Sequence, residues 1–104
     1  MIDPREHVIG KLVAYDKEEI TVSTTAIGLT AANLLTEPKP KEVYIQCESA
    51  SLRYFYDGST PTSSSGYLMV PRDTIRIKGT VNMGNILFIR SSSTDAKLTV
   101  TYER

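Results

Sequence analysis

Cys47 and His7 are the residue types in this chain that could form a nucleophile and its general base. The sequence contains one cysteine and one histidine, and the two side chains would need to lie within hydrogen-bonding reach to act together. His7 lies in a polar N-terminal stretch, whereas Cys47 alternates with Val43 and Ile45 on one face of a predicted strand. A thiol on an apolar face is usually a buried, inert core residue. The serines lack the Gly-x-Ser-x-Gly spacing of a nucleophile elbow, and we predict no catalytic residues.

Asp57 could begin a calcium-binding loop, because its carboxylate precedes a flexible glycine. The EF-hand pattern requires acidic or amide side chains at the third and fifth loop positions and a glutamate at the twelfth. Ser59, Pro61 and Leu68 occupy those positions here, so the pattern fails. The scarcity of cysteine and histidine also excludes a zinc site built from protein ligands alone. We expect Asp57 to accept hydrogen bonds from the backbone of its own turn, and we predict no metal and no cofactor.

Tyrosines are the remaining residue type with a chemistry to consider, because their rings can form a stacking platform for a sugar. Leu52, Tyr54 and Tyr56 would share one face of a strand, and Leu52 indicates that this face is buried. The chain contains no tryptophan, the largest ring for sugar stacking. We expect Tyr44, Tyr54, Tyr56 and Tyr67 to pack by their rings with the hydroxyls near the rim, and we keep glycan binding as an alternative.

The elements that must position these residues are strands joined by an elaborate polar turn. The aromatic run Leu52–Tyr56 favours extended backbone. Gly58 tolerates a positive φ, and Thr60 is pushed out of the helical region by Pro61. The residues that we assign to this structural turn are Asp57, Gly58, Thr60, Pro61, Thr62 and Gly66.

Short alternating segments recur along the rest of the chain. Asn85–Arg90 is apolar on both faces, which is typical of a central strand, and Tyr15–Lys17 reads as a turn between two strands. The predicted strands cover residues 8–14, 19–23, 42–48, 52–56, 67–70, 74–78, 85–90 and 96–102. The pattern shows no sustained helical period and predicts an all-β antiparallel sandwich, immunoglobulin-like or jelly-roll-like, with a small closed barrel as the alternative.

A long segment without a regular pattern covers residues 24–41. Ala31–Leu35 is long enough for one helical turn, but an isolated helix of that length is marginal in water, so we expect a loop with ordered contacts. Several of its side chains are apolar. Those that we assign to a protein–protein interface are Ile27, Leu29, Leu34 and Leu35, and we expect the N-terminal arm, residues 1–7, to make contacts as well.

Length and charge limit the classes of function. The chain of 104 residues has the length of a single domain, and one cysteine allows no internal disulfide. Twelve basic and twelve acidic residues cancel, which argues against nucleic-acid binding and favours self-association. The polar residues 1–6 predict no signal peptide. No apolar run approaches the roughly 18 residues of a membrane span, and we predict no membrane partner.

The turn carries a first resemblance. The run Tyr54–Ser65, with Tyr67 and Pro71 after it, resembles the Tyr-x-x-Asp-Gly-Ser-x-Pro-Thr signature of chitobiase C-terminal-like domains. Those domains are immunoglobulin-like β-sandwich modules appended to secreted glycoside hydrolases. The resemblance covers about a third of the chain and implies a sandwich fold with an accessory, carbohydrate-related and non-catalytic function.

A second resemblance spans most of the chain. Ile20–Val22, Ala26–Thr30 and Val43–Glu48, together with the Asp57-Gly58 turn and the closing Leu98–Tyr102, are similar to small virion-associated proteins of tailed bacteriophages. This resemblance implies a non-enzymatic structural protein of the virion, assembled in the host cytoplasm. Capsid decoration, also called cement, is the first expectation, and a neck, tail or fibre-attachment component is the second. It further implies a homo-oligomer that binds other virion proteins through many copies.

Overall fold

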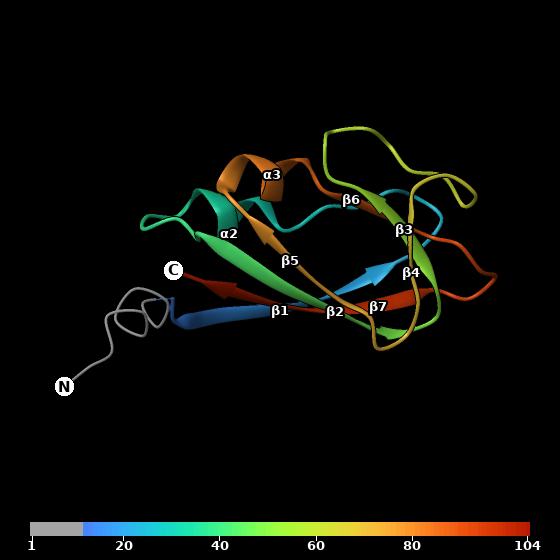
Figure 1. Cartoon of the computed structure of the whole chain (residues 1–104), viewed down its shortest axis with the longest axis horizontal. Helices are drawn as coiled ribbons and strands as arrows, with labels where there is room; N and C mark the ends of the chain where they lie inside the picture. Colours follow the sequence, from blue (N-terminus) through green and yellow to red (C-terminus); the bar gives the residue numbers. More distant parts are fainter. Residues whose placement is uncertain (1–11) are drawn as a thin grey trace.

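The chain forms strands in two antiparallel sheets, with two short helices grouped at one end (Figure 1), and the computed structural model describes residues 12–104. The four-stranded sheet has the order β1-β7-β2-β5, with β1 at Ala14–Val22, β7 at Ala96–Glu103, β2 at Glu42–Ser49 and β5 at Thr74–Lys78. The three-stranded sheet has the order β4-β3-β6, with β4 at Tyr67–Met69, β3 at Leu52–Phe55 and β6 at Leu87–Arg90. The prediction of an all-β sandwich is confirmed, and the closed barrel is wrong because the named strands divide into two separate sheets.

Period-two alternation explains how the strands bury one face. In β2, Val43, Ile45 and Cys47 are fully buried while the residues between them are half-buried. Their cross-strand partners in β7 are Tyr102, Val100 and Leu98, which are also buried. Because successive side chains of a strand point to opposite faces, this register places six apolar side chains on one inner face.

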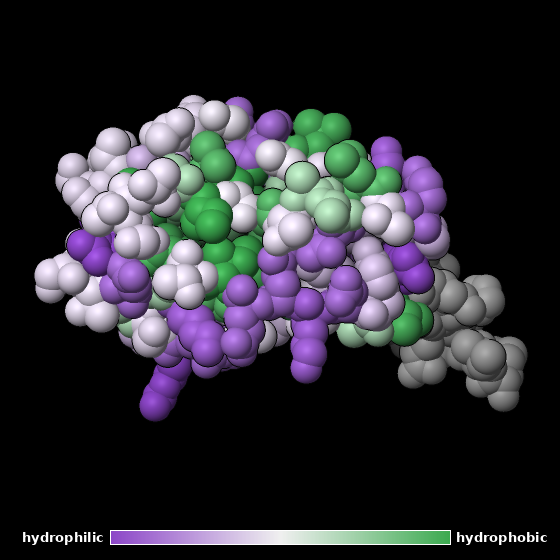
Figure 2. Space-filling model, turned by 180° about the vertical axis from the view of Figure 1, so that it is seen from behind, coloured by the Kyte–Doolittle hydropathy of each residue, from purple (hydrophilic) through white to green (hydrophobic). Residues whose placement is uncertain are grey.

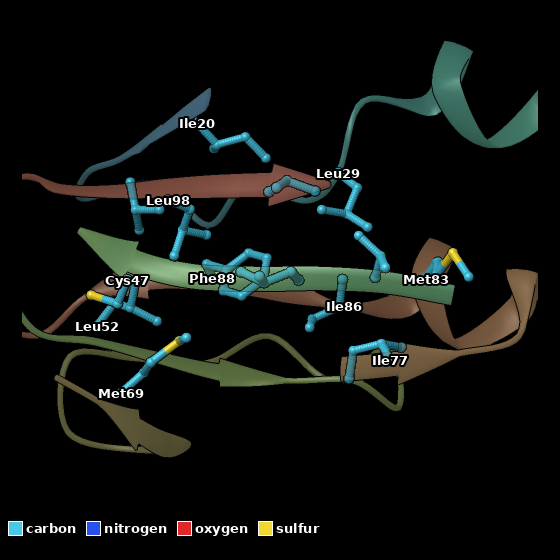
Figure 3. Close-up of a cluster of buried hydrophobic side chains, with 14 of the residues drawn as sticks. Ile20, Leu29, Cys47, Leu52, Met69, Ile77, Met83, Ile86, Phe88 and Leu98 are labelled. Atoms are coloured by element: carbon cyan, nitrogen blue, oxygen red, sulfur yellow. The ribbon is translucent and has the colours of Figure 1, made fainter. Parts of the chain in front are cut away.

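The core lies between the two sheets. Figure 3 shows Leu98 and Cys47 from one sheet facing the same interior as Leu52, Met69 and Phe88 from the other. All five side chains are at least 99% buried by relative accessibility, since none exposes more than 1%. Burying one large apolar side chain stabilises a fold by about 1.5–3 kcal/mol, so this shared interior is what holds the two sheets together.

The first described strand differs from the prediction. Tyr15–Lys17 is part of β1 and not a turn, and the register against β7 shifts between Ala14 and Asp16. A β-bulge at an edge strand can accommodate polar residues because one side of the strand faces solvent. Most of the strand predicted at residues 8–14, and the arm at residues 1–7, lie outside the described residues.

Two short helices replace segments that we expected to be irregular or extended. Helix α2 covers Ala31–Leu35, and helix α3 covers Thr80–Asn85. Sequence reasoning missed α3 because Val81, Asn82 and Gly84 are weak helix formers. Each helix buries one apolar side chain, Leu34 in α2 and Met83 in α3, so packing against the sandwich stabilises what local propensity does not.

The segment between β1 and α2 closes one flank of the sandwich. Ile27 and Phe88 form an isolated antiparallel bridge, with N–H···O distances of 2.9 and 2.8 Å in the two directions. The N–H of Arg90 also donates to the carbonyl oxygen of Ser23 at 3.0 Å. We expected β6 to be a central strand, but it lies at the edge of its sheet. The covering segment explains why β6 is nevertheless apolar on both faces.

Candidate functional site

The Asp57–Gly66 turn is built from its own hydrogen bonds. The Oδ1 atom of Asp57 accepts a hydrogen bond from the N–H of Ser59 at 3.0 Å. That bond is the main reason why the pKa of Asp57 lies below its usual range. Gly58 has φ 91°, a conformation that favours glycine. Asp57 is therefore placed as a turn residue whose carboxylate is already occupied by backbone.

Arg53 fixes the far end of the same turn. Its Nε atom donates to the carbonyl oxygen of Ser63 at 3.2 Å, and its Nη1 atom donates to that of Gly66 at 2.9 Å. Thr62 and Ser65 exchange backbone hydrogen bonds at 2.9 and 3.2 Å. The fork geometry of the guanidinium lets one side chain hold two carbonyls, so the turn is ordered by the strand that precedes it. Of the other assigned turn residues, Pro61 is buried and Thr60 is exposed.

Aromatic rings gather where β3 meets this turn. Tyr67 lies 5.6 Å from Tyr54, 6.0 Å from Phe55 and 6.3 Å from Tyr56, measured between ring centroids. The rings of Tyr56 and Tyr67 are inclined by only 29°. Tyr54 also packs on the buried Phe88 at 6.0 Å. The prediction that the tyrosines pack by their rings is confirmed for the half-buried Tyr54, whereas Tyr56 and Tyr67 are exposed.

We define the β4 patch as the exposed side chains of Tyr56, Tyr67, Leu68 and Val70. Their relative accessibilities are 43%, 57%, 52% and 38%. β4 is an edge strand of three residues whose one buried side chain is Met69. Tyr67 lies on the same strand face as Met69, and Leu68 lies on the other face, so the patch wraps around the edge strand. Exposed apolar side chains at such an edge are candidates for a binding surface. Figure 2 shows that hydrophobic residues also gather in the middle of one face of the molecule, above a border of hydrophilic residues.

Two cavities adjoin the aromatic rings. One, of about 270 Å³, is lined by Phe55, Tyr56, Asp57 and Tyr67. The other, of about 410 Å³, lies between the end of β3 and β5. Its lining residues are Tyr54, Tyr56, Ile75, Arg76, Ile77, Lys78 and Asn82.

Glu18 is the centre of a polar cluster that sequence reasoning missed. Its carboxylate accepts hydrogen bonds from the N–H and hydroxyl of Thr30, from the amide of Asn33 and from the hydroxyl of Tyr102. Burial raises the pKa of Glu18, but these hydrogen bonds together lower it further, so the net pKa lies below the ordinary value of 4.5. Burial and the bond to Glu18 raise the pKa of Tyr102. The cluster ties β1 to α2 and β7, which makes it a structural clasp.

A second polar cluster lies on the outer face of the four-stranded sheet. The Nη1 atom of Arg76 is 3.2 Å from Glu42 and 2.8 Å from Glu103. Its guanidinium also lies 4.7 Å from the centroid of the Tyr44 ring. Glu42 is almost fully buried, and a buried carboxylate requires such a partner. Arg76 is therefore committed to holding β5 against β2 and β7.

The residues that we assigned to an interface divide into two groups. Leu29 and Leu34 are each only 8% exposed and belong to the core, which corrects the expectation that they lie on the surface. The reason is that α2 turns one face toward the sheets and buries Leu34. Ile27 and Leu35 are exposed, and Leu35 is 70% accessible. Their assignment to an interface stays a prediction.

Cys47 occupies the environment that the sequence predicted, while His7 lies outside the described residues. The thiol is fully buried and donates to the carbonyl oxygen of Ala50 at 3.1 Å. Burial, and then the charge of Asp73, raise the pKa of Cys47, which disfavours the reactive thiolate. Within residues 12–104, no group of three or more acidic, histidine or cysteine side chains is placed to hold a metal ion.

No protein-family model matches this chain, and no curated protein or solved structure is significantly similar to it. Over the part of the chain that the structure describes, neither helix has the length and apolar character needed to cross a membrane. Among the described residues, the β4 patch and the adjoining cavities are the candidate binding surface.

Proposed function

We propose that this protein is a non-enzymatic structural component of a tailed-bacteriophage particle, assembled in the host cytoplasm, that acts through protein–protein contacts made by many copies. The single observation that carries the proposal is the β4 patch, where Tyr56, Tyr67, Leu68 and Val70 expose apolar side chains on and beside an edge strand. Aromatic side chains are enriched in the buried centres of protein interfaces. The sequence resemblance to virion-associated proteins supplies the class of partner.

Within that class, we propose capsid decoration first and a neck or tail position second. A decoration protein binds a repeating lattice, so weak contacts at each copy add up to stable attachment. A formal net charge of zero removes one obstacle to dense packing of copies. Clustered aromatic and aliphatic side chains provide the desolvated centre that such a contact needs.

Binding of purified particles by surface variants tests this proposal. Leu68→Ser in the β4 patch should weaken retention of the protein on particles by at least about fivefold, because loss of a buried anchor costs more than about 1 kcal/mol of binding free energy. Val13→Ser is the matched control, since Val13 is 59% exposed and outside the patch. Equal retention of both variants, or no retention of the unaltered protein on any particle fraction, would reject the proposal.

A carbohydrate-binding or accessory module of the chitobiase C-terminal-like type is the second candidate. The observation that favours it is the accessible pair Tyr56 and Tyr67, whose rings are inclined by 29° beside a cavity of about 270 Å³. Retention on a chitin or other polysaccharide column, lost in Tyr67→Ala and accompanied by indifference to particles, would select this candidate over the virion protein.

A further inference from the structure

Within residues 12–104, β5 is an edge strand that pairs with β2 on one side and with no strand on the other. The N–H of Cys47 donates to the carbonyl oxygen of Asp73 at 2.9 Å, and the register continues with Ile45 opposite Ile75. In an antiparallel pair, backbone groups of alternate residues point toward the partner and the others point away. The residues whose N–H and C=O groups point away from β2 are therefore Thr74, Arg76 and Lys78.

The larger cavity follows this free side. Four consecutive residues of β5, positions 75–78, line the cavity of about 410 Å³ together with Tyr54, Tyr56 and Asn82. The amide of Asn82 donates to the carbonyl oxygen of Lys78 at 3.1 Å, which confirms that this carbonyl is turned away from β2 and limits the free stretch at that end. At the opposite flank of the sandwich, the edge of β6 is bridged at Phe88 by Ile27.

We propose that the free edge of β5 binds an extended segment of a partner protein, which adds a strand to the four-stranded sheet. Strand addition satisfies the open N–H and C=O groups of an edge strand and supplies affinity through the main chain. Side chains of the added strand opposite Ile75 and Ile77 would enter the cavity and contact Tyr54 and Tyr56. Four consecutive lining residues along a strand edge fit an extended peptide better than a compact sugar ring. The inference rests on the proposed function only in taking the partner to be a protein.

Charge defines the partner further. Arg76 is already bound by Glu42 and Glu103, so a third carboxylate facing it would add repulsion. Lys78 makes no ion pair within residues 12–104, so an acidic residue directly opposite it would gain a cross-strand pair. We therefore expect an antiparallel segment that alternates apolar residues with polar ones and carries aspartate or glutamate opposite Lys78.

A peptide titration tests this inference without particles. The probe is the capped peptide Thr-Val-Glu-Val-Thr-Val-Thr, whose antiparallel register places Glu opposite Lys78 and its last two valines opposite Ile77 and Ile75, and its comparison peptide carries Lys in place of Glu. Titrated into isotope-labelled protein, the Glu peptide should shift the amide resonances of Thr74, Arg76 and Lys78 and should bind about two- to tenfold tighter than the Lys peptide.

Charge reversal provides the matched control. In Lys78→Glu the preference between the two peptides should reverse. The variant should melt at a lower temperature than the unaltered protein, because position 78 lies directly opposite Glu42, so binding is compared at a temperature where both proteins are folded. Tyr56→Ser should weaken binding of the Glu peptide, because the cavity wall is lost. Absence of peptide binding, shifts confined to other strands, or an unchanged preference in Lys78→Glu would overturn the inference. Particle binding that persists under those outcomes would leave the proposed function intact, and a saccharide that shifts the same resonances would favour the carbohydrate-binding candidate.

Discussion

At the scale of single residues, Gly66 is a position where the backbone conformation and the nearby backbone atoms both favour glycine over any residue with a side chain. Its φ of 132° is rarely adopted by residues with a side chain. A Cβ atom there would lie 3.2 Å from the backbone N and O atoms of Tyr54, which are held in β3 and cannot easily move. Gly79 also has a positive φ, 88°, but nothing lies within 4 Å of its would-be Cβ.

The pair of variants Gly66→Ala and Gly79→Ala separates these two effects. Both variants should lose about 1 kcal/mol of unfolding free energy from the strained φ, and Gly66→Ala should lose roughly 1–3 kcal/mol more from the collision. Chemical denaturation of both proteins measures the difference. Equal losses would show that β3 yields at Tyr54 and that the turn is less constrained than the geometry indicates.

At the scale of elements, Glu18 joins three segments that are distant in sequence. Thr30 directly precedes α2, and Asn33 lies within it. Tyr102 comes from β7, 84 positions after Glu18. Such a cluster stabilises the placement of α2, because its bonds are formed only when β1, α2 and β7 are all in place.

Stability should therefore depend on pH through Glu18. Its folded-state pKa is lowered below 4.5, so its contribution is fully present above that pH and is lost as the pH falls through the folded pKa. Thermal melts of the unaltered protein between about pH 6 and pH 3 should show a falling melting temperature, and Glu18→Gln should show a flatter dependence. Glu19→Gln is the control on the same strand, where Glu19 pairs with Lys97 at 3.1 Å, and it should behave like the unaltered protein.

Removal of the acceptor should have a larger effect than neutralisation. Glu18→Ala leaves the hydroxyl of the fully buried Tyr102 without the carboxylate that receives it, at a cost of about 1–3 kcal/mol of unfolding free energy. Equal stability of Glu18→Ala and Glu18→Gln would contradict this account of the clasp.

The strands were predictable from sequence and the clasp was not, for a physical reason. Alternation in β2 and β7 reports burial directly, because side chains two apart share a face. The hydrogen-bond partners of Glu18 depend on the packing of distant segments, so no spacing of residues near Glu18 in the sequence predicts them. Helix α2 escaped prediction for the same reason, since Leu34 and the bonds from Thr30 and Asn33 stabilise a turn that is marginal on its own. The Asp57–Gly66 turn was predictable because glycine and proline restrict the backbone locally.

At the scale of the whole molecule, neighbouring leucines of α2 serve different purposes. Leu34 is 8% exposed and packs in the shared core, whereas Leu35 is 70% exposed. The sandwich therefore buries one side chain of this pair and leaves the other exposed. Deleting residues 26–35 would remove both Leu29 and Leu34 from the core, so point variants are the sharper test of assembly.

Leu34→Ala should lower the unfolding free energy by about 2–5 kcal/mol, the usual cost of truncating a buried leucine. Leu35→Ala should change it by no more than about 0.5 kcal/mol, but it should weaken self-association if α2 contacts a second copy. Denaturation measures the first effect, and light scattering over a concentration series measures the second. An unaltered protein that stays monomeric at high concentration would remove Leu35 from the predicted interface.

The position of β7 also governs when the fold can form. β7 lies between β1 and β2 in the four-stranded sheet although it is the last described strand along the chain. During synthesis, β1 and β2 are therefore made before the strand that lies between them. Neither can complete its pairing with β7 until residue 103 has left the ribosome. Pairing across such sequence distances slows folding to milliseconds or longer. A nascent chain stalled before Ala96 would expose the apolar faces of β1 and β2. We therefore expect chaperones to be most needed before β7 has been synthesised.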